Sequence, residues 1–261
     1  MFQNDFKRGE PIPFFYLFFY FCYYISNMEI YGLVKSSLID YPGKICAIVF
    51  TGGCNFRCNF CYSGELVLQE KIKIQPKISQ EYFDNFLEEH RNLIDGIVIC
   101  GGEPTLHKDL PDFIEKIKKY GYLVKLDTNG SNPEMLQYLI KKKLIDYVAM
   151  DIKGPKEKYG KICGINIDIS NIERSVDILK ESNINFEFRT TITPRDLDKS
   201  DFPAIADWIG GDNVNYFLQN FSNKKETIDS SLLEEIPYSS NYIQNICSEI
   251  SSRFKNCRFR A

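Results

Sequence analysis

Six short apolar runs alternate with amphipathic stretches from residue 44 onward, and this alternation limits the possible folds more than any other feature of the chain. The runs are rich in Val, Ile, Leu and Phe, which is typical of parallel strands buried on both faces. They occupy residues 44–50, 97–100, 122–127, 147–152, 185–191 and 215–220. Six strands that alternate with helices predict an α/β fold, a partial (β/α)6 TIM-like barrel of parallel strands.

The stretches between these runs carry the signals of helices. Apolar residues recur at helical spacing near residues 79–87, 109–121, 132–140, 172–179 and 205–209. Ser79 can cap the first of these helices, and Asn132 stands directly before Pro133, which favours the first helical turn. The tail, residues 239–261, predicts a helix followed by a short closing strand.

Composition limits the partners and the compartment. The chain has 261 residues, 44% hydrophobic content and a formal net charge of −3, which fits one globular domain and provides no positive field for nucleic acid. Nine cysteines are too few for a disulfide scaffold, and an odd number leaves at least one unpaired. We therefore expect a protein of the reducing cytoplasm that does not bind nucleic acid.

Residues 1–27 differ from the rest of the chain. They contain an apolar, aromatic stretch from Pro11 to Ile25 that is too short to span a bilayer and is followed by no signal-peptidase site. We expect this segment to be an over-long translation start outside the fold, with a peripheral anchor as the alternative. Residues 28–261 are expected to form a single domain without a membrane partner.

Three cysteines, Cys54, Cys58 and Cys61, follow the first predicted strand within eight residues. Thiolate groups this close together are typical of zinc or iron–sulfur sites. Structural zinc and an ordinary [4Fe–4S] cluster both take four protein ligands, so three cysteines leave one metal position open to an outside ligand. The alternative is a closed structural site in which a distant cysteine supplies the fourth ligand. Cys46 and Cys100, inside apolar runs, are expected to be core residues.

Polar residues follow each predicted strand. In barrels of this kind the reactive groups gather at the carboxyl ends of the strands, where these residues would meet. Besides the cysteine loop, the polar segments are residues 101–105, 127–130, 151–155, 189–191 and 219–220. Their common position predicts one site at the mouth of the barrel.

The motif Cys54-x3-Cys58-x2-Cys61, with Phe60 before the third cysteine and Gly-Gly-Glu-Pro at residues 101–104, resembles the radical S-adenosylmethionine superfamily. The resemblance implies that the three cysteines hold a [4Fe–4S] cluster whose fourth iron binds the amino and carboxylate groups of S-adenosylmethionine. Electron transfer to the sulfonium would then yield a 5′-deoxyadenosyl radical. It also implies the cofactor contacts: Phe60 near the adenine, and Gly101, Gly102 and Glu103 at the amino group.

A finer pattern resembles the enzymes that activate pyruvate formate-lyase. It implies a monovalent-cation site near the cofactor carboxylate, formed by Asp127, Thr128, Asp151 and the backbone carbonyl of Met150. Lys153 would pair with that carboxylate. The alternative for Asp151 and Lys153 is an ordinary solvated turn.

Residues 31–44, 151–155 and 188–191 resemble the activating proteins of anaerobic ribonucleoside-triphosphate reductase. This resemblance implies hydrogen abstraction from a glycine of a partner reductase, with flavodoxin or ferredoxin as the reductant. Asp40 and Arg189 are the expected contacts of the partner's glycine loop. The chain departs from the pattern at residues 62–64, where Tyr-Ser-Gly replaces His-Asn-Pro or Tyr-Asn-Pro, and this leaves the adenine contacts and the partner's identity open.

Two other functions stay open. One is a radical S-adenosylmethionine enzyme that acts on a small molecule, like 7-carboxy-7-deazaguanine synthase. The other is a non-catalytic iron–sulfur module for electron transfer, which requires a fourth protein ligand and gives no reason for the Gly-Gly-Glu-Pro segment.

Overall fold

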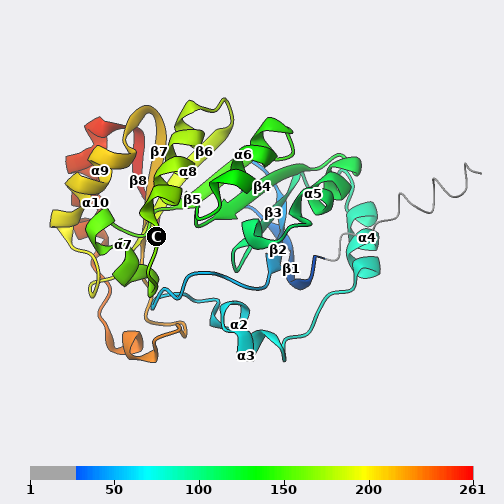
Figure 1. Ribbon diagram of the computed structural model, residues 1–261, viewed down its shortest axis with the longest axis horizontal. Helices are drawn as coiled ribbons and strands as arrows, with labels where there is room; N and C mark the ends of the chain where they lie inside the picture. The colour runs from blue at the N-terminus through cyan, green and yellow to red at the C-terminus, as the bar shows by residue number, and fades with distance from the viewer. Residues whose placement is uncertain (1–27, 261) are drawn as a thin grey trace, which may run out of the picture.

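A curved eight-stranded sheet organises the protein (Figure 1). The computed structural model describes residues 28–260, so the expectations for residues 1–27 lie outside the described part. The strands follow one another in chain order: β1 (Ile30–Ser37), β2 (Cys46–Thr51), β3 (Gly96–Gly101), β4 (Leu123–Thr128), β5 (Tyr147–Asp151), β6 (Asn185–Ile192), β7 (Gly211–Asn220) and β8 (Phe254–Arg260).

The helices are connections between successive strands. They are α2 (Gly64–Val67), α3 (Gln69–Ile72), α4 (Gln80–Glu89), α5 (Leu110–Lys119), α6 (Pro133–Lys141), α7 (Lys156–Cys163), α8 (Ile169–Glu181), α9 (Phe202–Ile209) and α10 (Ser240–Ile250). Short 3₁₀ helices add η1 (Pro104–Leu106), η2 (Lys199–Asp201), η3 (Ser230–Glu234) and η4 (Ser251–Arg253). In Figure 1, α10 lies beside β7 and β8 and also contacts α9, and α5 lies beside β4.

The α/β fold and the partial barrel are confirmed. Every neighbouring pair from β2 to β8 is parallel, and β1 adds an antiparallel edge that the sequence pattern did not predict. Within residues 28–260, β1 and β8 do not pair, so the barrel stays open on one side. Helix caps follow the sequence signals, since the side chain of Ser79 accepts from Tyr82 N and that of Asn132 from Met135 N.

Two apolar layers lie on opposite faces of the sheet. The larger layer joins the sheet to the helices, and alternating strand residues such as Ile97 and Ile99 point into it. A smaller cluster lies inside the barrel and contains Tyr41, Cys46, Ile48 and Val98. No helix within residues 28–260 is both long and apolar enough to cross a membrane.

Candidate active site

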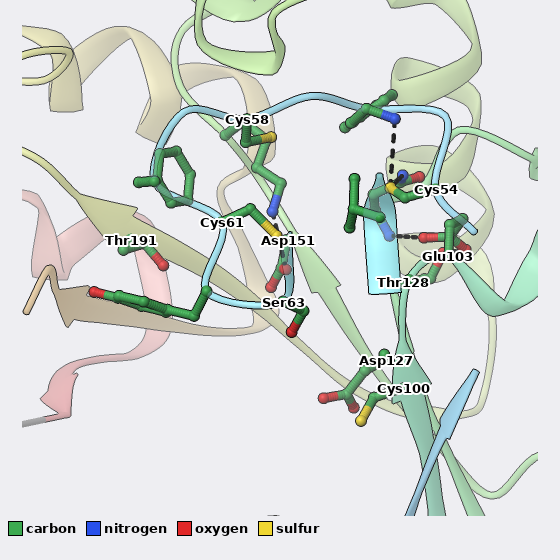
Figure 2. Close-up of a pocket in the computed structure, with 18 of the residues that line it drawn as sticks. Cys54, Cys58, Cys61, Ser63, Cys100, Glu103, Asp127, Thr128, Asp151 and Thr191 are labelled. Atoms are coloured by element: carbon green, nitrogen blue, oxygen red, sulfur yellow. Dashed lines mark hydrogen bonds and ion pairs between the residues drawn. The ribbon is translucent and has the colours of Figure 1, made fainter. Parts of the chain in front are cut away.

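A cavity of 270 Å³ opens at the carboxyl ends of the strands (Figure 2). It brings together most of the residues predicted to form the site: Cys54, Cys58, Phe60, Cys61, Gly101, Gly102, Glu103, Asp127, Thr128, Asp151, Lys153 and Arg189. Met150 does not line the cavity, because its fully buried side chain packs under Gly130. Asp40 lines a second cavity of 480 Å³, which shares Arg189 with the first.

The cysteine loop is held by hydrogen bonds within the loop and by one to the end of α7. Within the loop, Cys61 N donates to Cys58 O at 3.1 Å, and the guanidinium of Arg57 donates to Cys54 O at 2.6 Å. The backbone N of Arg57 donates to Cys163 O at 2.7 Å, which fixes the loop against the end of α7. All three cysteines line the cavity, and Figure 2 shows Cys58 and Cys61 near each other and Cys54 closer to Glu103.

The three thiols have different surroundings. Burial raises the pKa of Cys54 to about 12 and also raises that of Cys61. A hydrogen bond with the thiol of Cys163 lowers the pKa of Cys58. Since thiolates, not thiols, bind metals, cluster binding here releases protons from the cysteines.

The arrangement of the thiols also bears on which metal centre fits. Among residues 28–260, no three Cys, His, Asp or Glu side chains converge closely enough to hold a single metal ion. In a cluster each cysteine binds a different iron, so the ligands stand farther apart than around one ion. Thiolates bind zinc as well as iron–sulfur clusters, but a closed zinc site needs four ligands around one ion, so three separated cysteines fit an iron–sulfur cluster better.

The Gly-Gly-Glu segment packs directly against the start of the cysteine loop. Gly102 N donates to Thr51 O at 2.9 Å, and Glu103 N donates to Gly53 O at 2.7 Å. A Cβ atom on Gly102 would lie 2.0 Å from Gly53 O, and Gly101 has a φ of 112°. Only glycine tolerates this close approach and this backbone conformation, which explains the two consecutive glycines.

Glu103 is 1% exposed, and its carboxylate accepts four hydrogen bonds. Its Oε1 accepts from Thr105 N (3.1 Å) and from the hydroxyls of Thr105 (2.6 Å) and Thr128 (2.7 Å). Within residues 28–260, its Oε2 accepts a hydrogen bond only from Asn129 N, at 2.6 Å. Burial raises the pKa of Glu103 and the hydrogen bonds oppose this shift. Because a carboxylate oxygen can accept about two hydrogen bonds, Oε2 retains the capacity for one more donor.

A network of charged groups crosses the barrel interior below the cysteine loop. Arg189 joins two carboxylates, with its Nη1 2.9 Å from Asp127 Oδ2 and its Nε 2.9 Å from Asp151 Oδ1. Lys125 contacts Asp127, and Lys153 Nζ lies 3.1 Å from Asp151 Oδ2. Burial alone would raise the pKa of Asp151, but Arg189 and Lys153 lower it to about 2. Lys153 is only 14% exposed, so it does not lie in a solvated turn.

The structure adds residues that the sequence reasoning missed. Cys100 was expected in the core, but its position on β3 directs it into the barrel, where it lines the cavity; Cys46 is buried as expected. Asn129 contacts Cys54, and Cys163 contacts Cys58, although nothing in the sequence links Cys163 to the cysteine loop. Asn129 belongs to the polar segment 127–130 that the sequence placed at the site, but no sequence signal assigned it an individual role.

Comparisons with known proteins agree with this site. The sequence profile of the radical SAM superfamily matches residues 48–209. Two Methanocaldococcus jannaschii proteins, provisionally named glycyl-radical enzyme activating enzymes, are 38% identical over 74% of this chain and 80% of their own length, and 26% identical over 88% and 91%.

Solved structures share the fold. SuiB of Streptococcus suis bound to S-adenosylmethionine has a TM-score of 0.60 at 14% identity, covering 82% of this chain and 51% of SuiB. TYW1 with a lysine-pyruvate adduct has a TM-score of 0.56 at 16% identity, covering 80% of this chain and 74% of TYW1. The chain belongs to the radical S-adenosylmethionine superfamily of enzymes, whose cofactors are a [4Fe–4S] cluster and S-adenosylmethionine.

Proposed function

We propose that this protein activates a glycyl-radical enzyme by removing a hydrogen atom from the Cα of one glycine of its partner. The observation that carries the proposal is the contact between the Gly-Gly-Glu segment and the cysteine loop, through Glu103 N and Gly53 O at 2.7 Å. This contact brings a buried carboxylate and three thiols to one cavity. The relatives named as activating enzymes support the choice of partner class.

In this proposal each cavity residue has a defined task. Cys54, Cys58 and Cys61 hold the cluster, and the free acceptor site of Glu103 Oε2, with the backbone of Gly101 and Gly102, receives the amino group of the cofactor. Phe60 lies against the adenine, and Lys153, whose Nζ lies 5.7 Å from the centre of the Phe60 ring, pairs with the cofactor carboxylate. When bound, the two cofactors supply one-electron cleavage of a carbon–sulfur bond, and the protein supplies orientation and exclusion of water.

A monovalent cation at Asp127, Thr128, Met150 and Asp151 is a finer part of the proposal. Arg189 bridges the two aspartates, so a cation at this position must take at least one carboxylate from Arg189. Cofactor affinity measured in potassium chloride against tetramethylammonium chloride tests this part. A cation site predicts tighter binding in potassium at equal ionic strength.

The second cavity provides the proposed entry for the partner. Ile39, Asp40, Lys125, Arg189, Gln219 and Arg260 line it, and Arg189 separates it from the cofactor cavity. We place the partner's glycine loop against Asp40 and Arg189. The specific partner in this proposal is anaerobic ribonucleoside-triphosphate reductase in the cytoplasm, with flavodoxin or ferredoxin as the reductant.

Anaerobic reconstitution tests the proposal. The protein is loaded with iron and sulfide, reduced, and mixed with S-adenosylmethionine and the reductase, and the glycyl radical is measured by electron paramagnetic resonance together with 5′-deoxyadenosine. We expect a glycyl signal that Cys54→Ala, Cys58→Ala or Cys61→Ala abolishes. Cys257→Ala, on β8 away from the cavity, is the matched control and should retain the signal.

The other outcomes separate the alternative functions. Cofactor cleavage without a glycyl radical would indicate another partner or a small-molecule substrate. A protein with a fully loaded cluster that never cleaves S-adenosylmethionine would refute the proposed enzymatic function and favour an electron-transfer module.

A further inference from the structure

Asn129 contacts both the Gly-Gly-Glu segment and the cysteine loop of the candidate active site. It follows β4 directly and is 6% exposed. Its backbone N donates to Glu103 Oε2 at 2.6 Å, on the side expected to bind the cofactor. Its side-chain Nδ2 lies 3.8 Å from Cys54 Sγ, within hydrogen-bonding distance for sulfur, and 3.0 Å from Asn55 Oδ1.

The orientation of the Asn129 amide is fixed by its neighbours. Its Oδ1 accepts from Ser131 N at 2.9 Å, so its NH₂ group must face the cysteine loop. Asn55 is oriented in turn, because its own Nδ2 donates to Ser131 Oγ at 2.9 Å and leaves its Oδ1 toward Asn129. The two hydrogens of the Asn129 amide therefore have separate acceptors, Asn55 Oδ1 and Cys54 Sγ.

A donor at this sulfur has a predictable electrostatic effect. A reduced cluster carries one more negative charge, part of which lies on the cysteine sulfurs, so a hydrogen bond to a sulfur stabilises the reduced form more than the oxidised form. Phe56 N also donates to Cys54 Sγ, at 3.4 Å, but Asn129 supplies the one side-chain hydrogen bond to this sulfur in the described part of the chain.

We propose that Asn129 is a positioning residue that raises the reduction potential of the cluster through its hydrogen bond to Cys54 and aligns the cysteine loop with Glu103. This inference rests on the proposed assignment of Cys54 as a cluster ligand. Because the bond to Glu103 comes from the backbone, a side-chain substitution at Asn129 removes the donor to sulfur and leaves the cofactor side of the contact in place.

The test compares Asn129→Ala and Asn129→Asp with the wild type. Asn129→Asp is nearly isosteric and keeps an acceptor for Ser131 N, so it preserves the turn if alanine does not. Asn55→Ala is the matched control, since it removes the neighbouring amide contact without removing the donor to Cys54. Each reconstituted protein is titrated potentiometrically without S-adenosylmethionine, and the reduced cluster is followed by electron paramagnetic resonance.

We expect all four proteins to hold the cluster, and both Asn129 variants to have lower midpoint potentials than the wild type. A tenfold loss in the equilibrium constant for reduction corresponds to a fall of about 59 mV for a one-electron couple. The midpoint potential of Asn129→Asp should fall further, because this substitution adds negative charge beside the cluster. Asn55→Ala should keep the wild-type potential.

The contrary results are distinguishable. Unchanged potentials in both Asn129 variants would overturn the inference and leave the proposed function intact. If the midpoint potential of Asn55→Ala falls as much as that of the Asn129 variants, the change comes from the position of the loop, and the inference is overturned. Loss of the cluster from both Asn129 variants would show that Asn129 has a purely structural role, which also overturns the inference. A wild-type protein that binds no cluster would overturn the proposed function, and the inference with it.

Discussion

Replacing Glu103 with Gln tests the centre of the proposed cofactor site. Three donors converge on Glu103 Oε1, and the amide oxygen of Gln at the same position can still accept all three hydrogen bonds. The NH₂ group of Gln must then occupy the Oε2 position, where it faces Asn129 N and, in the proposed site, the ammonium group of the cofactor. The substitution thus converts an acceptor for two donors into a third donor and removes the negative charge.

The size of the effect follows from these contacts. A hydrogen bond to a charged group contributes about 1.5–3 kcal/mol, and each 1.4 kcal/mol is a factor of ten in affinity. We therefore expect Glu103→Gln to weaken S-adenosylmethionine binding about 10- to 150-fold. The matched control is Glu65→Gln, an exposed carboxylate on α2 outside the cavity lining, which should bind as the wild type does.

The assay is anaerobic isothermal titration calorimetry of the cluster-loaded proteins with S-adenosylmethionine. The pH dependence gives a second signature, because burial raises the pKa of Glu103 and only the ionised carboxylate accepts the ammonium group. Wild-type affinity should fall as the pH is lowered through this raised pKa, and Glu103→Gln should lack that step. Equal affinities of wild type and Glu103→Gln would refute the assignment of Glu103 as the cofactor's acceptor.

Three further predictions concern the cysteines and the charged network. Cys100→Ala and Cys163→Ala should retain the full iron content of the wild type, because three cysteine ligands suffice. Loss of iron from either variant would identify a fourth ligand and favour the alternative of a closed structural site. Arg189→Leu should destabilise the fold by about 1.5–3 kcal/mol in urea unfolding, because Asp127 and Asp151, both partly buried, lose the hydrogen bonds of their shared partner and keep only Lys125 and Lys153. An unchanged midpoint would contradict this. Since the folded-state pKa of Asp151 is depressed, its contribution to stability is present above the ordinary pKa of 3.8 and should be lost as the pH falls toward about 2. Urea unfolding across this pH range should show a fall in the free energy of unfolding of the wild type, and a smaller fall in that of Arg189→Leu.

The expected destabilisation of Arg189→Leu limits the use of this variant to test the proposed contact between Arg189 and the partner's glycine loop. Its side chain is 15% exposed and pairs with both aspartates, so loss of partner activation in Arg189→Leu would reflect the damaged network as well as a lost contact. Asp40, whose side chain accepts a hydrogen bond from Ser37 at the rim of the second cavity, is the cleaner probe of the partner's glycine loop.

Much of the fold could be predicted because its signals are local. Continuous apolar runs produced strands β2 to β7, and residues such as Ser79 and Asn132 marked helix starts through side-chain hydrogen bonds that lie within three residues. Strand β1 escaped prediction because much of it is only partly buried or exposed, so it has no continuous apolar run.

The sequence by itself determined the three closely spaced cysteines, the Gly-Gly-Glu segment and their positions at strand ends, because in a parallel barrel all strand ends meet at one mouth. Only the tertiary structure decided which side chains face each other across that mouth. Cys163 reaches Cys58 across about a hundred residues, and Arg189 on β6 joins aspartates on β4 and β5. Such contacts depend on strand register and on the packing of α7, which are set by the whole core and not by any local pattern.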